Sequence, residues 1–242
     1  MIFKCMLLKI GCEGMAHQRI EAATAARPGL GGAIYRHLLE AYLRGTRAFS
    51  SNSIARELGI SPNTANLAIR ALEGIGAVTA SRRSFEVTDF KKALMYWAAL
   101  RRLERSIAYS TFVGIGAKAI EAKLPAGALP TAYSGYSALY GNDVADYGEV
   151  YVYATGPVIS ELGRRFPRKL LSAKSDYADL VVLRPDRVLE ASIAAGRAGA
   201  AAPPTQICVD LWNIRGWQAS RFFARLMERL DERLRAQPLA GV

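Results

Sequence analysis

The sequence predicts an α+β protein in two parts, a small N-terminal domain rich in helices and a larger C-terminal domain of mixed helices and strands. Three observations lead to this fold class. The chain has 242 residues, which suits one large domain or two ordinary ones. Hydrophobic residues make up 51% of it and charged residues 22%, enough apolar surface to offset the entropy of ordering the chain. Finally, helical and strand-like periodicities both occur along it.

The chain is strongly basic, since Lys+Arg 32 against Asp+Glu 21 gives a net charge of +11. Such a balance favours acidic partners. Most of the excess lies in the first half, where residues 1–110 hold 16 basic and 8 acidic residues while the remainder holds 16 and 13. We therefore expect any nucleic-acid surface in the first half. A solvated face on a basic protein is the alternative.

The three cysteines form neither a paired framework nor a CxxC motif, which argues against a disulfide scaffold and favours a reducing, cytoplasmic interior. Residues 1–11 are a poor signal peptide because Lys4 and Lys9 interrupt the apolar run and no small-residue cleavage site follows. No run reaches the roughly 20 apolar residues of a membrane span. We expect residues 1–29 to be a tail, either an amphipathic arm or a segment upstream of a true start at Met15, and we expect no membrane partner.

Three helices are predicted in the first domain, at residues 31–44, 51–58 and 61–75. Ser50 or Ser51 can cap the second helix through its hydroxyl. Gly59 then ends it in a left-handed turn, and Ser61 followed by Pro62 opens the third helix with the residues preferred at N-cap and N1. This is the spacing of a helix-turn-helix.

A two-stranded hairpin is predicted directly after the third helix. Residues 76–79 and 85–88 have strand character and residues 81–84 form a polar turn between them. A hairpin in this position is the wing of a winged helix, so we predict that residues 30–88 form a winged helix-turn-helix domain.

This stretch resembles the winged-helix domains of GntR-type bacterial and archaeal regulators. The resemblance is carried by the run Ser61-Pro62-Asn63-Thr64-Ala65 and by Ala68, Leu72, Gly76 and Val78 at their offsets from it. It implies double-stranded DNA as partner and transcription regulation as function.

The outward face of the third helix carries the residues expected to read bases. Asn63, Asn66 and Arg70 follow one another at helical spacing. Asn can pair bidentately with adenine and Arg with guanine in the major groove. These residues are therefore expected to contact base edges, with protein contacts of a solvated face as the alternative.

A second set is expected to position the domain on the DNA backbone. Ser61 and Thr64 lie at the N-terminus of the third helix, where free amides and the helix dipole favour phosphate. Arg82 and Arg83 lie at the tip of the predicted wing, where they can enter a minor groove or hold phosphates.

Residues 89–110 are predicted to form a linker, with one continuous helix over 89–109 that Asp89 caps. An apolar stripe runs along it, made of Leu94, Trp97, Leu100, Leu103 and Ile107. The stripe suits packing between domains and equally packing between two copies of the chain. In a homodimer, two recognition helices could read successive major-groove faces.

Residues 111–242 are predicted to form a mixed α/β domain. Strands are expected at residues 131–134, 149–154, 180–183 and 206–211, and helices at residues 136–140, 157–166, 185–195 and 216–235. Residues 196–204 are expected to be a loop.

The second domain resembles a degenerate nucleotidyltransferase-like domain, as found behind a winged helix in AbiEi-type antitoxins and related regulators; the resemblance is carried by residues 131–140, 150–153 and 209–211. Active members have a Gly-Ser turn, an Asp-x-Asp pair for Mg²⁺ and a third acidic residue on a later strand. Here Ser134-Gly135 is reversed, Glu149 and Tyr151 occupy the places of the pair, and only Asp210 matches. We therefore expect no catalytic residue, no metal site and no cofactor.

The sequence thus predicts a sequence-specific DNA-binding transcriptional regulator. One alternative is a nucleotidyltransferase-like enzyme whose winged helix positions its substrate. Another is an antitoxin-type interaction module that binds a protein partner through the second half.

Overall fold

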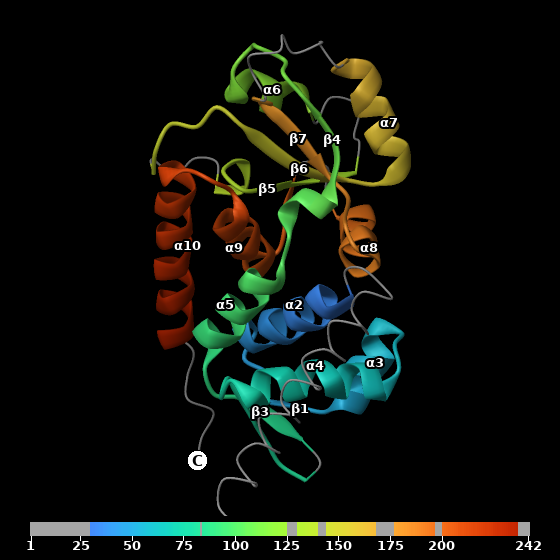
Figure 1. Cartoon of the computed structure of the whole chain (residues 1–242), viewed down its shortest axis with the longest axis vertical. Helices are drawn as coiled ribbons and strands as arrows, with labels where there is room; N and C mark the ends of the chain where they lie inside the picture. Colours follow the sequence, from blue (N-terminus) through green and yellow to red (C-terminus); the bar gives the residue numbers. More distant parts are fainter. Residues whose placement is uncertain are drawn as a thin grey trace, which may run out of the picture. The chain divides into compact units, whose positions relative to one another are not determined.

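The computed structural model of the chain describes residues 30–82, 84–124, 130–139, 144–167, 177–196 and 200–236. Its fold is α+β with two separate sheets, in agreement with the predicted class (Figure 1). The chain divides into two compact units, Met1–Tyr96 and Trp97–Val242. The predicted tail at residues 1–29 and Arg83 lie outside the described residues.

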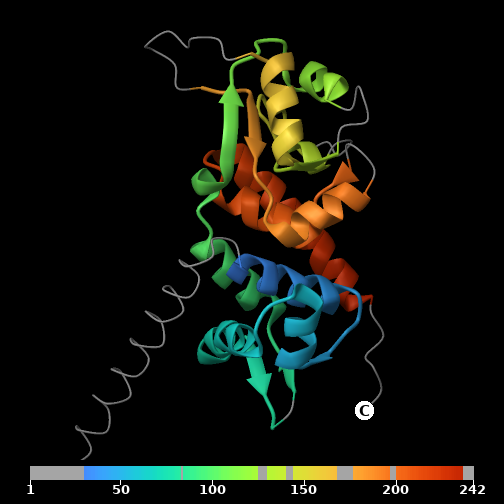
Figure 2. The same cartoon turned by 90° about the vertical axis from the view of Figure 1, so that its right-hand side faces the viewer.

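The first unit contains helices α2 (Leu30–Leu43), α3 (Ser51–Leu58) and α4 (Pro62–Gly74) and strands β1 (Ala48–Phe49), β2 (Val78–Ala80) and β3 (Phe85–Val87). The strands form an antiparallel sheet in the order β1-β3-β2. The β2–β3 hairpin extends beyond α3 and α4 (Figure 2). The three predicted helices and the two strands after them are confirmed as elements.

Local signals explain where these helices begin and end. Ser50 is the N-cap of α3, because its Oγ accepts a hydrogen bond of 3.1 Å from the Ser53 amide. Gly59 ends that helix with φ +63° and donates to the carbonyls of Ala55 and Arg56, the left-handed geometry that glycine adopts at low cost. Ser61 caps α4 ahead of Pro62.

The core of the first unit forms where the apolar faces of its helices meet. Helix α4 buries one face, made of Ala65, Ala68, Ile69 and Leu72. Ile54 of α3 and Leu38 and Leu39 of α2 are at most 1% exposed. Removing this apolar surface from water stabilises the fold, and it leaves the opposite, polar face of α4 in solvent.

The predicted helix over residues 89–109 is wrong beyond residue 100. Helix α5 (Phe90–Leu100) begins as expected, since Asp89 Oδ1 accepts a 2.8 Å hydrogen bond from the Lys92 amide. It is followed by a 3₁₀ turn, η1 (Leu103–Ser106), and by strand β4 (Ile107–Thr111). Pairing at a sheet edge overrides the helical pattern here, and Leu100 and Ile107 of the predicted stripe are each 40% exposed.

The second unit is built on a five-stranded sheet in the order β4-β7-β6-β5-β8. Its other strands are β5 (Thr131–Ser134), β6 (Val150–Ala154), β7 (Leu180–Leu183) and β8 (Ala200–Ala201). The β4–β7 and β5–β6 pairs are antiparallel, and the β6–β7 and β5–β8 pairs are parallel. Three of the four predicted strands are confirmed, and β8 lies in the segment expected to be a loop.

Helices cover both faces of this sheet (Figure 1). Helices α6 (Ala117–Lys123) and α7 (Gly156–Arg165) pack on one face in a cluster with Val150, Val152 and Val182. On the opposite face lie α9 (Pro204–Asn213) and α10 (Trp217–Arg235). Helix α8 (Arg187–Ala195) and a 3₁₀ turn, η2 (Ser137–Leu139), complete the described part.

The strand predicted at residues 206–211 is wrong, because these residues lie in α9. Every residue from Thr205 to Leu211 is buried. A run that is buried on all sides shows no periodicity, so a short apolar helix cannot be told from a buried strand by pattern alone. Pro204 at the first position of the helix is the local signal for the correct assignment.

The glycine at the α3–α4 turn gives a test of the first unit. Gly59→Ala should lower the free energy of unfolding by about 1 kcal/mol, because a Cβ is disfavoured at positive φ. The matched control is Gly74→Ala, at the end of α4, where an added Cβ meets nothing within 4 Å and the stability should stay the same or rise. Chemical denaturation of both variants measures the difference, and equal effects would contradict this account of the turn.

Candidate nucleic-acid interface and buried polar centre

The polar face of α4 is exposed in the first unit. Asn63, Asn66 and Arg70 are all exposed, whereas Ala65, Ala68 and Ile69 between them are buried. Neither Asn63 nor Arg70 has a side-chain hydrogen bond or an ion pair with any residue that the structure describes. The three side chains predicted to read bases are therefore on one solvent-facing surface, and two of them have all their donors available.

Asn66 is held in place by Ser51, which the sequence indicated only as a candidate cap of the second helix. Ser51 Oγ, at the N-terminus of α3, donates a 2.6 Å hydrogen bond to Asn66 Oδ1. The Asn66 amide nitrogen keeps its two donor hydrogens, and the carbonyl oxygen keeps one lone pair. The bond orients the amide across the two helices and leaves it able to pair with a base.

The hydroxyl groups at the start of α4 are used within the helix. Ser61 Oγ accepts a 3.1 Å hydrogen bond from the Thr64 amide and lies 2.8 Å from Thr64 Oγ1. Pro62 has no amide hydrogen, so the Asn63 amide is the backbone donor of the first turn that remains for an anion. The single bond between the two hydroxyls uses one of their two hydrogens, so the predicted phosphate contact at Ser61 and Thr64 is left with one hydroxyl donor.

Arg82 lies exposed at the tip of the β2–β3 hairpin. Ser81 and Ser84 close the turn around it, because the Ser81 amide donates to the Ser84 carbonyl at 2.7 Å and Ser81 Oγ donates to the same oxygen at 2.9 Å. Arg83, predicted to act with Arg82, lies outside the described residues. The structure thus places one of the two predicted wing arginines at the tip.

The His37–Glu57 pair, which joins α2 and α3 of the first unit, contributes little positive charge at neutral pH. His37 Nε2 lies 3.1 Å from Glu57 Oε2. Burial lowers the pKa of His37, and the attraction of Glu57 only partly offsets this. The positive charge of the proposed interface therefore comes from arginine side chains such as Arg70 and Arg82.

A buried carboxylate lies at the centre of the second unit. Asp210 on α9 is 0% exposed and accepts hydrogen bonds from four side chains. The donors are Arg101 Nε at 2.7 Å, Ser134 Oγ at 2.7 Å, Tyr153 Oη at 2.7 Å and Gln206 Nε2 at 3.0 Å. Burial alone would lower the pKa of Arg101, but the adjacent Asp210 carboxylate raises it above its usual value.

These contacts correct the sequence-based match of Asp210 to the third catalytic carboxylate of a nucleotidyltransferase. Asp210 lies on a helix and not on a late strand, and its two oxygens are already saturated by protein donors. Glu149 accepts its own hydrogen bond, of 2.9 Å, from the Tyr151 hydroxyl. Within the described ranges, no group of three or more His, Cys, Asp and Glu side chains is arranged to hold a metal ion.

Comparisons of the chain with protein-family models, with curated proteins and with solved structures give no match. Over the residues that the structure covers, none of the helices combines the length and the apolar character needed to cross a membrane.

The buried carboxylate gives a second test. Asp210→Ala should lower the free energy of unfolding by about 3–5 kcal/mol, because it leaves the Arg101 guanidinium, whose side chain is only 17% exposed, without its partner. Glu228→Ala is the control, since it breaks an exposed ion pair with Arg225 and should cost less than about 1 kcal/mol. Denaturant unfolding compares the two.

A variant that replaces both partners distinguishes loss of the ion pair from general disruption of the core. Arg101→Met combined with Asp210→Leu removes both charges together and should cost less than the sum of the two single substitutions. Additive costs, or a cost of Asp210→Ala as small as that of the control, would show that the two charges do not depend on each other.

Proposed function

We propose that the first unit is a winged helix-turn-helix domain that binds double-stranded DNA in a sequence-specific manner, and that the chain is a transcriptional regulator. The observation that carries the proposal is the exposed face of α4, on which Asn63, Asn66 and Arg70 present amide and guanidinium groups to solvent. The order of elements in the first unit supports the proposal as well. Helix α3, the turn at Gly59, helix α4 and the following hairpin form an arrangement that suits insertion of α4 into a major groove.

The length of this face matches a short recognition site. Residues 63–70 of α4 span about 10 Å along the helix axis at roughly 1.5 Å per residue, which corresponds to about three base-pair steps. Arg70 is assigned to a guanine and Asn63 and Asn66 to adenines, each bidentate pair contributing about 1–3 kcal/mol of discrimination.

Contacts to the DNA backbone fix the register in this proposal. The Asn63 amide and the positive end of the α4 dipole favour a phosphate at the start of the helix. Arg82, at the hairpin tip, reaches a second phosphate or a minor groove. These contacts supply affinity that depends on salt but not on base sequence.

The second unit acts as a scaffold in this proposal and not as a nucleotidyltransferase. A catalytic carboxylate must offer oxygen lone pairs to Mg²⁺, and the oxygens of Asp210 are taken up by Arg101, Ser134, Tyr153 and Gln206. An interaction with a protein partner through this unit remains the second candidate, and co-purification of a specific partner in place of DNA binding would favour it.

The test begins with duplexes that the native chain selects from a randomised pool, followed by fluorescence anisotropy at several salt concentrations. Arg70→Ala should weaken binding to the selected site by about 1–3 kcal/mol and relax the base preference at one position. Arg82→Ala should weaken selected and unrelated duplexes about equally and reduce the salt slope by about one.

Arg225→Ala on α10 is the matched control, because it removes an exposed arginine from the other unit and should leave the selected site bound as before. Failure to enrich any sequence, or an unchanged base preference in Arg70→Ala, would refute the proposed reading of bases by α4. Equal losses of affinity in Arg70→Ala and Arg225→Ala would mean that the chain binds DNA only through general charge attraction.

A further inference from the structure

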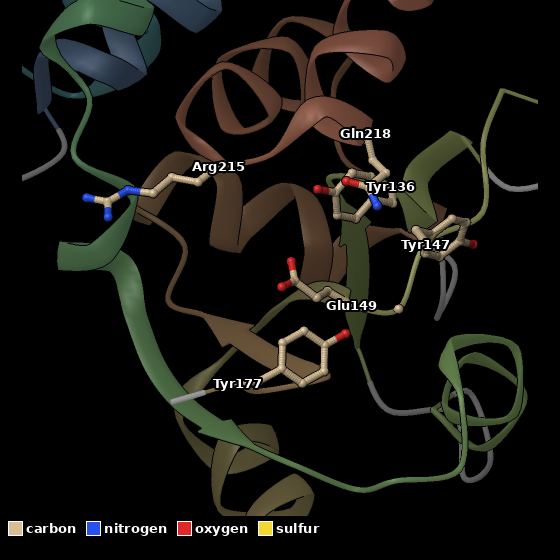
Figure 3. Close-up of a pocket in the computed structure, with 7 residues that line it drawn as sticks. Tyr136, Tyr147, Glu149, Tyr177, Arg215 and Gln218 are labelled. Carbon is tan, nitrogen blue, oxygen red and sulfur yellow. The ribbon is translucent and has the colours of Figure 1, made fainter. Parts of the chain in front are cut away.

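The second unit contains a pocket that the proposed DNA-binding function does not use (Figure 3). The pocket has a volume of about 190 Å³, and its walls include Tyr136, Tyr147, Glu149, Tyr177, Arg215 and Gln218. These residues come from the turn after β5, the segment that leads into β6, residue 177 ahead of β7, the loop between α9 and α10, and the start of α10. Segments far apart in the sequence therefore converge on it.

Aromatic rings form the walls and hold one another in place. The rings of Tyr136 and Tyr147 stack with their centroids 5.5 Å apart. The buried Phe222 ring of α10 meets both of them edge to face, at 5.2 Å and 5.7 Å. Such contacts stabilise a fixed arrangement of rings, so this wall of the pocket is formed before any ligand arrives.

Glu149 places in the pocket a carboxylate that has no positive partner in the part of the chain that the structure describes. Its side chain is half-buried and accepts one hydrogen bond, from the Tyr151 hydroxyl. It forms no ion pair with any described residue, and Figure 3 shows the Arg215 guanidinium directed away from it. A carboxylate that has lost part of its hydration is costly to keep charged. Burial therefore raises the pKa of Glu149 above its usual value.

We propose that this pocket binds a small organic ammonium ion, with Glu149 as counter-charge and the rings of Tyr136 and Tyr177 as walls. Figure 3 shows the carboxylate of Glu149 between these two rings. Tyrosine faces attract a cation within about 6 Å of the ring centre, and the carboxylate adds a direct charge interaction. A neutral molecule of the same shape gains neither contribution.

The size of the pocket limits the ligand. A cavity of about 150 Å³ accepts a single benzene molecule, and sites for drug-sized ligands begin near about 300 Å³. The present pocket, at about 190 Å³, therefore suits an amine with a short aliphatic chain or one ring. The N–H donors of a primary ammonium group match the oxygens of Glu149 and the side-chain carbonyl oxygen of Gln218.

Gly148 is the residue that allows Tyr177 to close this side of the pocket. A Cβ placed on Gly148 would collide with the Tyr177 hydroxyl. Tyr177 is 43% exposed, so its side chain can move away without loss of core packing. Gly148→Ala consequently displaces one wall while it leaves the charge of Glu149 unchanged.

Isothermal titration calorimetry of the full chain without DNA tests the proposal, with n-butylammonium chloride as probe and n-butanol as its neutral counterpart. We expect saturable binding of the amine and at least about tenfold weaker binding of the alcohol. Glu149→Gln should reduce the affinity for the amine at least about tenfold, which corresponds to about 1.4 kcal/mol. Glu190→Gln, an exposed carboxylate on α8, is the matched control and should bind as the native chain does.

Variants at Tyr177 distinguish the contribution of its ring to amine binding from that of its hydroxyl. Tyr177→Phe keeps a ring face and should retain the affinity within about twofold, whereas Tyr177→Leu and Gly148→Ala should each weaken binding by about threefold or more. Thermal unfolding of each variant checks that the fold persists.

The proposal is overturned by absence of saturable amine binding to the native chain, by equal binding of amine and alcohol, or by native-like affinity in Glu149→Gln. Because no DNA is present in these titrations, failure here leaves the proposed DNA-binding function standing, and failure of that function leaves this site standing.

Discussion

The second unit is organised around one buried negative charge. Asp210 has no contact with solvent, and a carboxylate in such a place is tolerated only when donors replace the water it has lost. Its four donors come from four segments: the residue after α5, the end of β5, the fourth residue of β6 and the third of α9. The carboxylate therefore fixes how α9 lies on the sheet, since a shift of any one segment would leave a buried polar group unpaired.

A second carboxylate beside the same sheet, that of Glu149, differs from Asp210 in how far its charge is compensated. Tyr151 and Tyr153 are two residues apart on β6, so their side chains leave the same face of the strand. Tyr153 donates to Asp210, which is fully compensated, and Tyr151 donates to Glu149, which has no ion-pair partner among the described residues. The first arrangement stabilises a fold, whereas the second leaves an attraction for a cation from outside. This contrast is why we assign a structural role to Asp210 and a ligand to the pocket at Glu149.

In the first unit, the decisive constraint is the division of α4 into two faces. The apolar face of α4 is buried against α2 and α3. The polar face on the other side of the helix, with Asn63 and Arg70, is therefore exposed to solvent. The Ser51–Asn66 hydrogen bond adds order to that polar surface at little cost in available donors. A rigid helix that carries one oriented amide, at Asn66, and a guanidinium with all its donors available, at Arg70, suits contact with base edges, and this is the physical basis of the proposed DNA-binding function.

The sequence by itself determined the elements whose signals are local. Caps, prolines and glycines located α3 and α4, strand-like runs located β5 and β6, and helical spacing placed Asn63, Asn66 and Arg70 on one face. Tertiary structure decided the rest. The end of α5 and strand β4 depend on a distant partner strand, because Tyr109 pairs with Val182, 73 residues further along the chain. Helix α9 is buried on all sides and so shows no hydrophobic period. The Asp210 network and the Glu149 pocket combine side chains from separate segments, and no local pattern records which distant groups will meet, because that choice is made by packing.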